Sequence, residues 1–250
     1  MVEEEYYKMA LGEGNHWWYR SLHQLVLRSI GKYFTEKDIS ILDAGCGTCG
    51  LITFLKANGY ENISGFDSSK TAVQICQSKG IQVRQGDLQR ISSHFKSQEA
   101  DIIISNDVLY FFDEQEQRKI TDDIHEVLKS GGLLICNMPS ISAFRGMHDV
   151  RVGIKKRFQK KDLWTAFDQN KYELVQETYW PFFLSPFIWT KRISQRVRMR
   201  FNMPVKMESD IKPEYGLLNS ALYLTTKLEN NLFSRKPFGS SLFLVFKKKI

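Results

Sequence analysis

The chain has 250 residues, 42% of them hydrophobic, which is enough for one α/β domain with a core that needs no disulfide or metal to hold it together. No apolar run is long enough to span a bilayer, and nothing at the N-terminus resembles a secretory signal, so we expect a cytoplasmic protein whose four cysteines are free thiols. The net charge of +7 indicates an anionic partner, which could be nucleic acid, a phosphate-bearing substrate or an acidic membrane surface.

Residues 1–38 precede the first strand and are expected to be helical. Acids at positions 3–5 favour a helix start, and residues 22–30 have the apolar spacing of a second helix. Between them, residues 16–20 read His-Trp-Trp-Tyr-Arg. These aromatics either fix the second helix to the core or form a lid over a ligand.

Residues 39–50 are predicted to form a buried parallel strand that turns sharply into a helix at Thr48. Gly45, Gly47 and Gly50 fit G-x-G-x-x-G, the pattern of a backbone turn that approaches a nucleotide-like ligand closely. The pattern alone serves NAD, FAD and S-adenosylmethionine equally. Asp43 argues against NAD, because a carboxylate there would repel a pyrophosphate but would suit a cationic ligand.

This stretch resembles the first motif of class I S-adenosylmethionine-dependent methyltransferases, a hydrophobic run followed by D-x-G-C-G-x-G. Cys49 stands where the third glycine often falls, and Gly50 follows it. The aromatic segment 16–20 is similar to one in bacterial small-molecule methyltransferases of sugar, glycolipid and natural-product pathways. That resemblance implies a lid in which Arg20 pairs with the carboxylate of the cofactor's methionine part.

Cys46 and Cys49 also spell C-x-x-C, which in a βαβ context could be a redox pair. That interpretation leaves Asp43, Gly45 and Gly50 without a role, whereas the cofactor loop uses all three. No metal site is predicted.

Acids also follow the next two predicted strands. A helix is expected over residues 51–57, a strand over 62–66, a helix over 69–78 and a strand over 81–85. Asp67 lies 24 positions after Asp43, close to the offset of an acid that holds a ribose. Asp87 can accept from an adenine amine while the Leu88 N–H meets a ring nitrogen. Each acid alone could be a helix cap or a turn residue. Acids at the ends of three successive strands match the family pattern, and that match extends over about 100 residues.

The fourth strand is predicted at residues 100–105 and opens into Asn106, which in the family borders cofactor and substrate. Nucleobase amino-methyltransferases place N-P-P-Y or D-P-P-Y here, and the missing prolines argue against that activity. A helix over residues 115–129 and a fifth strand over 133–138 follow. His148 lies just beyond, and its pKa range makes it the leading general base. Asp107 and Asp149 are weaker candidates.

The C-terminal part supplies a helix over residues 161–168 and a sixth strand over 171–179. Residues 241–246 resemble the last strand of the family, inserted antiparallel beside the sixth. The interval between them holds an aromatic segment at 180–189, a basic cluster at 191–200 and a predicted helix at 217–233. It could cap a greasy or phosphate-bearing acceptor, rest on a membrane or bury itself in a homodimer. A second basic cluster lies at 155–161.

The predicted fold is α/β, a Rossmann-like doubly wound sheet, mostly parallel with an antiparallel last strand. A single domain is divided into an N-terminal helical lid (1–38), a cofactor-binding core (39–179), a substrate-side helical insertion (180–240) and the last strand (241–250). The expected activity is S-adenosylmethionine-dependent methyl transfer to an O, N or C atom of a small molecule, either apolar or anionic. The alternative from the basic C-terminal half is an RNA-binding protein or RNA methyltransferase, and DNA is not an expected partner.

The resemblance implies which residues bind S-adenosylmethionine. They are Trp18, Arg20, Asp43, Gly45, Cys46, Gly47, Asp67, Ser68, Gly86, Asp87, Leu88, Asn106, Asp107 and Val108. The candidates that would orient or deprotonate the acceptor are His148, His16 and Tyr110.

Overall fold

The computed structural model describes residues 3–201, 203 and 216–249, and one sheet runs through this part of the chain. Its strands are β1 (Ile41–Ala44), β2 (Ile63–Asp67), β3 (Arg84–Gln85), β4 (Ala100–Asn106), β5 (Leu128–Pro139), β6 (Tyr172–Trp180) and β7 (Ser241–Lys248). The order across the sheet is β3-β2-β1-β4-β5-β7-β6. The neighbours from β3 to β5 pair in parallel, and β7 is antiparallel to both β5 and β6. The predicted fold class is confirmed, including the place of the last strand.

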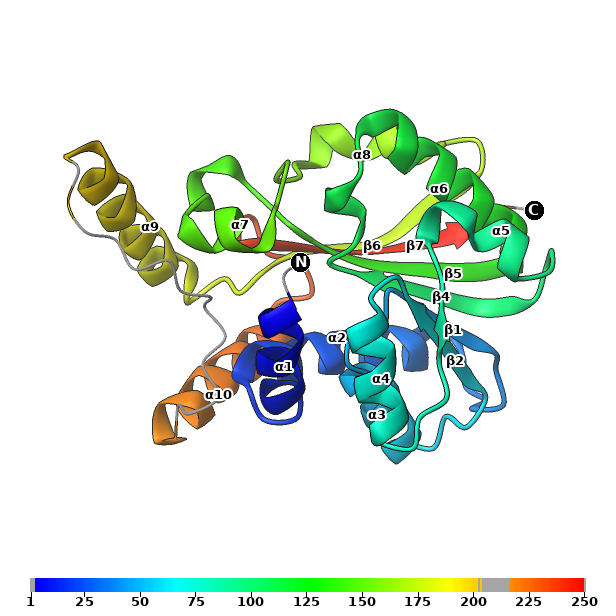
Figure 1. Ribbon diagram of the computed structural model, residues 1–250. Coiled ribbons are helices and arrows are strands. Elements are labelled where there is room, and N and C mark those ends of the chain that lie inside the picture. The colour runs from blue at the N-terminus through cyan, green and yellow to red at the C-terminus, as the bar shows by residue number, and fades with distance from the viewer. Residues whose placement is uncertain (1–2, 202, 204–215, 250) are drawn as a thin grey trace.

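Helices cover both faces of the sheet (Figure 1). They are α1 (Glu3–Gly12), α2 (Trp17–Tyr33), α3 (Gly50–Ala57), α4 (Lys70–Ser78), α5 (Ile91–His94), α6 (Glu114–Val127), α7 (Met147–Val152), α8 (Leu163–Ala166), α9 (Ser185–Arg200) and α10 (Gly216–Leu232). In Figure 1, α5, α6 and α8 lie above the sheet, and α2, α3 and α4 lie below it.

The central strand β4 shows how the sequence builds two cores at once. Ile102 and Ile104 pack with α2 and α3, whereas Ile103 packs with α6. Successive side chains of a strand point to opposite faces, so an uninterrupted run of isoleucines is buried on both sides. This arrangement is typical of a parallel strand in the middle of a covered sheet.

The structure corrects some predicted boundaries. The helix predicted to end at Lys129 stops at Val127, and β5 begins at Leu128 instead of after the glycine pair. The glycines therefore lie within the strand, where Gly131 takes a φ of 74°. The basic cluster at 191–200 was not predicted to be helical, yet it forms most of α9. Pro186, at the first turn of α9, is well placed to start that helix.

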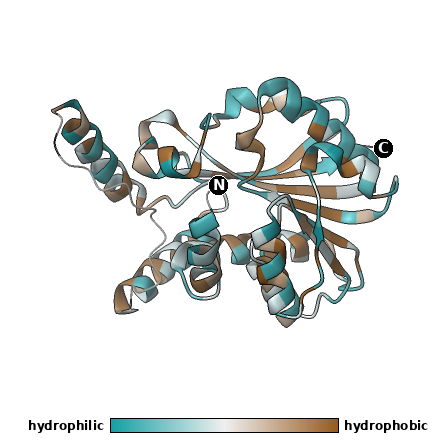
Figure 2. Ribbon diagram, viewed as in Figure 1, coloured by the Kyte–Doolittle hydropathy of each residue, from teal (hydrophilic) through white to brown (hydrophobic). Residues whose placement is uncertain are grey.

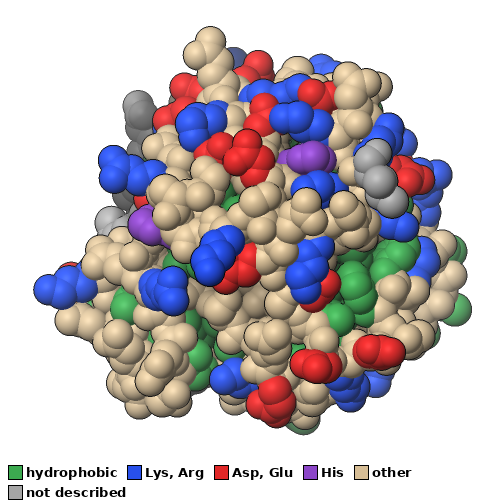
Figure 3. Space-filling view, turned by 90° about the vertical axis from the view of Figure 1, so that its right-hand side faces the viewer, with side chains coloured by type: hydrophobic (Ala, Val, Ile, Leu, Met, Phe, Trp, Pro, Cys, Tyr) green, Lys and Arg blue, Asp and Glu red, His purple; other side chains and the backbone are tan. Residues whose placement is uncertain are grey.

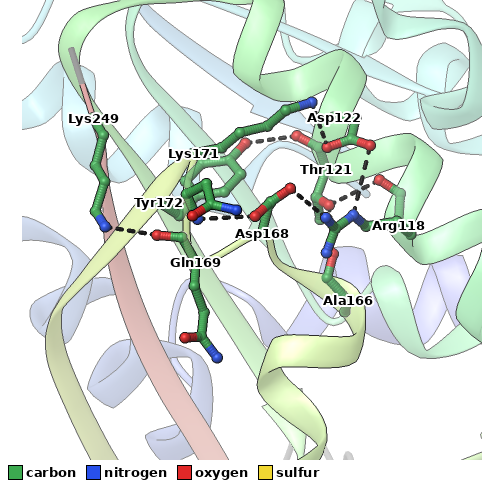
Figure 4. A network of polar contacts seen from close by, with 10 residues as sticks. Arg118, Thr121, Asp122, Ala166, Asp168, Gln169, Lys171, Tyr172 and Lys249 are labelled. Atoms are coloured by element: carbon green, nitrogen blue, oxygen red, sulfur yellow. Dashed lines mark hydrogen bonds and ion pairs between the residues drawn. The ribbon is translucent and has the colours of Figure 1, made fainter.

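Polar contacts fix α6 to the loop before β6 and to the start of that strand (Figure 4). Arg118 pairs with Asp168, and Lys171 Nζ lies 2.8 Å from Asp122 Oδ1. The hydroxyl of Tyr172 donates to the backbone carbonyl of Thr121 at 2.6 Å. These contacts join elements distant in sequence and hold the α6 layer over the antiparallel end of the sheet.

The basic cluster at 155–161 is largely compensated within the protein. Lys156 Nζ lies 2.7 Å from Glu114 Oε1, and Lys160 Nζ lies 2.6 Å from Glu177 Oε1. Arg157 is buried against the carboxylate of Asp149. Three of the five cations thus serve internal contacts, and this cluster is a poor candidate for the surface that meets an anionic partner.

The prediction of four free thiols is wrong for two of them. Cys49 and Cys76 form a disulfide, and Cys46 and Cys136 are free and buried. The bond joins the residue that begins α3 to the last part of α4, 27 positions away. Sequence spacing gave no sign of it, because the two sulfurs meet only once α4 packs beside the glycine turn.

Candidate functional site

A cavity of about 840 Å³ opens at the carboxyl ends of β1, β2 and β4. Residues of α1 and the start of α2 cover one side of it, and residues of α9 and α10 border another. A crevice at the carboxyl ends of parallel strands is where doubly wound sheets bind ligands. Every residue predicted for the cofactor or for catalysis lines this cavity except Arg20 and the weaker candidate Asp149.

The glycine turn forms the floor of the cavity. The N–H groups of Gly45 and Cys46 both donate to the Phe66 carbonyl, at 2.9 and 3.0 Å, and this holds the turn beside β2. Gly45 takes a φ of 89°, and a side chain there would collide with Val108. Glycine is required at this position both by its backbone conformation and by the close approach of the loop after β4.

Asp67 links the end of β2 to the same turn. Its Oδ2 accepts from the Gly47 N–H at 3.0 Å, and its Oδ1 accepts from the Ser69 N–H at 2.8 Å. Burial raises the pKa of this carboxyl, and the two backbone hydrogen bonds oppose that rise. Asp67 therefore does the work of a turn former and also presents a carboxylate to the cavity, as its place at the end of the second strand predicted.

Burial strongly raises the pKa of two further acids of the cavity. It raises the pKa of Asp43 to about 8, helped by repulsion from Glu13 and Asp67. It raises the pKa of Asp107 to about 7, against a hydrogen bond from Asn137. Asp107 also adopts a left-handed backbone with a φ of 58°, a conformation that tends to occur at functional sites. Buried carboxyls gathered in this way suit a ligand that carries positive charge.

Asn106 supplies an independent observation about the ligand. Its amide oxygen is buried and has no hydrogen-bond partner among the described residues, although the residue lines the cavity. A buried acceptor is costly unless a donor meets it. An ammonium group would satisfy it, so the acids, the bare glycine turn and this amide together fit a cationic amino-acid nucleotide such as S-adenosylmethionine.

Asp87 and Leu88 lie where an adenine pocket was predicted. The Asp87 carboxylate accepts from the Gln89 N–H at 3.0 Å and so begins a short turn of 3₁₀-helix. The Gly86 N–H donates to the Asp67 carbonyl at 3.0 Å, which places the loop after β3 directly beside the end of β2. The capping role and the ligand role of Asp87 are therefore compatible.

Glu13 was missed by the sequence reasoning. It follows α1, and its Oε2 accepts from the Gly50 N–H at 2.9 Å and from the Thr48 hydroxyl. Burial raises the pKa of Glu13 to about 7. The N-terminal segment is thus bonded to the glycine turn by an acid. Its only sequence signal was a carboxylate after a predicted helix, and its partners lie 35 and 37 positions away.

Glu13 makes the stability of the protein depend on pH. An unfolded glutamate titrates near its model value of 4.5, so between about pH 4.5 and 7 the folded state binds a proton that the unfolded state has lost. This contribution to stability is present at low pH and disappears as the pH rises to about 7. Between these pH values we expect the free energy of unfolding of the wild type to fall by up to about 3 kcal/mol relative to that of Glu13→Gln. Denaturant melts of both proteins at a series of pH values measure it, and a difference that does not change with pH would contradict the assignment.

The candidate catalytic residues all face the cavity from different elements. His16 precedes α2 and its Nδ1 accepts from the Trp18 N–H at 3.3 Å. His148 lies on α7, and Tyr110 lies in the short turn after β4, with its ring 4.3 Å from that of Phe111. Burial raises the pKa of Tyr110 well above its usual range, so this hydroxyl is a donor and not a base.

Three candidate side chains have other roles in the structure. Arg20 stacks on the ring of Tyr223 in α10 at 3.7 Å, so the structure does not bring it to the cofactor group. Asp149 is bound by the Arg157 guanidinium, which removes it as a base. The ring of Trp18 lines the cavity and also stacks on Trp180 at 5.3 Å, which combines the two interpretations of the aromatic segment.

Cys46 lines the cavity beside the disulfide, with its sulfur 3.9 Å from that of Cys49. Burial and the neighbouring acids raise the pKa of this thiol far above its usual range. A thiol of this kind is a weak nucleophile, so a redox role for the Cys46–Cys49 pair finds no support.

Part of the chain is similar to known methyltransferases. Residues 42–136 match the family model described as a methyltransferase domain. A protein of Geobacillus sp. strain WCH70 named "putative methyltransferase" is 28% identical over 141 residues, which is 54% of this chain. The match spans 55% of that relative, about half of its length.

Solved structures of methyltransferases share the fold. A SAM-dependent methyltransferase from Archaeoglobus fulgidus gives a TM-score of 0.58 at 16% identity, over 91% of this chain and 94% of its own. The N-methyltransferase NodS from Bradyrhizobium japonicum, solved with S-adenosyl-L-homocysteine, gives a TM-score of 0.54 at 14% identity, over 92% of this chain and 87% of its own.

No helix in the described part of the chain is long and apolar enough to cross a membrane.

Proposed function

We propose that the chain is an S-adenosylmethionine-dependent methyltransferase that transfers a methyl group to a small-molecule acceptor, a proposal supported by the match of residues 42–136 to a methyltransferase-domain model. The observation that carries the proposal is one cavity lined both by the cofactor motifs and by side chains of the C-terminal insertion. The glycine turn and the strand-end acids would form its cofactor end. Leu184, Ile188 and Leu222 give apolar walls to the part that we call the acceptor end.

The residues divide into two tasks. Asp43, Asp67 and Asp87, with the glycine turn and Asn106, would hold the cofactor, which supplies a methyl group on a positively charged sulfur. The apolar walls would exclude water and orient the acceptor for in-line attack, and orientation is worth several kcal/mol in such reactions. His148 faces the same cavity and would take the proton of a hydroxyl acceptor.

The acceptor end favours a substrate with an apolar body. Aromatic and aliphatic side chains of α9 and α10 border it, and Lys191 and Arg192 of α9 add positive charge. These properties match an apolar or anionic small molecule better than a nucleobase, because the loop after β4 lacks the prolines that clamp a flipped base.

Formation of S-adenosylhomocysteine tests the proposal. Purified protein is incubated with S-adenosylmethionine and panels of hydroxylated, amino and lipid-linked small molecules, with bulk RNA as a parallel panel. We expect turnover with a small molecule, and about 100-fold lower kcat for His148→Gln when the acceptor is a hydroxyl, since general-base catalysis contributes at least that much. His94→Gln, an exposed histidine at the end of α5, is the matched control. Turnover confined to RNA would overturn the small-molecule proposal.

A further inference from the structure

Helix α9 carries a strong and one-sided charge. Its residues Ser185–Arg200 include five basic side chains and no acid. In Figure 1 the helix projects from the body of the protein, and its outer end is exposed on all sides at residues 196–201. A helix end without a core contact must owe its composition to something other than internal packing.

Large apolar side chains alternate with the arginines at this outer end. Val197, Met199 and Phe201 are 46%, 46% and 69% exposed, between Arg196, Arg198 and Arg200. At the other end of α9, Phe187 is 73% exposed and Trp189 is 45% exposed. Exposed apolar side chains beside arginines suit a membrane interface, where the apolar groups enter the acyl boundary and the guanidinium groups stay among the headgroups.

Helix α10 adds an exposed leucine stripe on the same side of the protein. Leu217, Leu224 and Leu228 are 91%, 60% and 53% exposed, and their spacing of seven and four residues places them on one face. The opposite face packs on α2: the hydroxyls of Thr226 and Ser21 are hydrogen-bonded. The leucines therefore point away from the protein and have no core to enter.

Both helices also border the cavity. Phe187 and Ile188 of α9 line it, and so do Leu218 and Leu222 of α10. Figure 2 shows apolar positions along both helices out to their ends. On the side of the molecule shown in Figure 3, acidic and basic side chains are interspersed, whereas α9 carries five basic side chains and no acid.

We propose that α9 and α10 form a docking surface for an anionic lipid bilayer. The exposed Arg196, Arg198 and Arg200 pair with headgroup phosphates, and the apolar side chains of both helices enter the interface beside them. Charge decides between a membrane and a second copy of the chain, because two copies would bring two helix ends that each carry these three arginines and no acid against each other. On the proposed function, docking would place the acceptor end of the cavity at the bilayer surface, where an apolar acceptor resides.

Vesicle flotation tests the docking surface. The full chain is mixed with phosphatidylcholine vesicles or with vesicles that also contain phosphatidylglycerol, and binding is expected to the anionic vesicles alone. The variant Arg196→Glu/Arg198→Glu/Arg200→Glu is expected to bind them at least tenfold more weakly, since each cation near such a surface contributes about fivefold. The variant Val197→Ser/Met199→Ser/Phe201→Ser tests the apolar part and is expected to weaken binding as well.

A matched control separates local charge from net charge. Lys32→Glu/Lys56→Glu/Lys96→Glu changes the net charge equally at exposed positions away from α9 and α10, and it is expected to retain more binding than the arginine variant. Equal losses in both variants would overturn the proposal. So would a concentration-dependent dimer that Leu224→Asn/Leu228→Asn dissociates, without any vesicle binding by the wild type. Titration with S-adenosylhomocysteine measures the cofactor site independently, so failure of docking and failure of the proposed function are distinguishable.

Discussion

Replacement of Asp67 by alanine is expected to weaken the binding of S-adenosylhomocysteine about 1000-fold. The carboxylate holds the glycine turn through the Gly47 N–H and the next helix through the Ser69 N–H, and it lines the cavity where the ribose hydroxyls would lie. Hydrogen bonds to a charged group contribute about 1.5–3 kcal/mol each, so the loss of two to the ligand gives about 4 kcal/mol. Isothermal titration calorimetry measures the change.

Two controls make this result specific. Asp38→Ala removes an exposed carboxylate ahead of β1 and should leave the affinity unchanged. The thermal unfolding curve of Asp67→Ala shows whether the glycine turn still folds. A folded Asp67→Ala variant with wild-type affinity would exclude Asp67 as the ribose ligand and with it the assignment of the β2 end.

Replacement of Asp149 by alanine is expected to cost about 4 kcal/mol of folding stability. Its carboxylate accepts from Arg157 Nε at 2.6 Å and from Nη2 at 2.7 Å, and the Asp149 side chain is only 1% exposed. The same guanidinium donates to the carbonyls of Ser140 and Ser240 at 2.9 and 3.1 Å. Loss of the acid leaves a buried cation without its counterion, which typically costs 3–5 kcal/mol. The melting temperature should fall by about 8–16 °C.

The double variant Asp149→Leu/Arg157→Met is the informative comparison. It removes both charges and fills the space with apolar side chains, so it should be much more stable than Asp149→Ala. If the two variants unfold at the same temperature, the loss comes from packing and not from the unpaired cation. The pair also explains why Asp149 is no catalytic base, although its position after the fifth strand made it a candidate.

The strand-end motifs were predictable because they depend on local sequence. Hydrophobic runs closed by an acid and glycines mark buried parallel strands, and parallel strands bring their carboxyl ends to one edge. Asp43, Asp67 and Asp87 therefore had to lie together once the strands were placed. The antiparallel place of β7 came from the resemblance to a family and was confirmed by the sheet order.

Contacts between segments distant in the chain could not be predicted from the sequence. Glu13 reaches the glycine turn, Cys49 bonds to Cys76, and Arg20 turns to α10. Each depends on how a helix is rotated and packed against the sheet, and local spacing carries no information about that. The helix over residues 185–200 was missed for a related reason. Few of its side chains are buried, so its apolar residues do not recur with the 3.6-residue spacing that reveals a helix in a sequence.

By itself the sequence determined the parallel strands, the glycine turn and the three acids, because hydrophobic runs and turn chemistry act over a few residues. The tertiary structure alone decided which of the remaining side chains line the cavity. In the folded protein Glu13 accepts a hydrogen bond from the glycine turn, and Arg20 stacks on Tyr223 instead of lining the cavity. Asp149 forms a buried ion pair with Arg157. Those outcomes follow from burial, which forces charged and polar side chains to find partners wherever packing brings them.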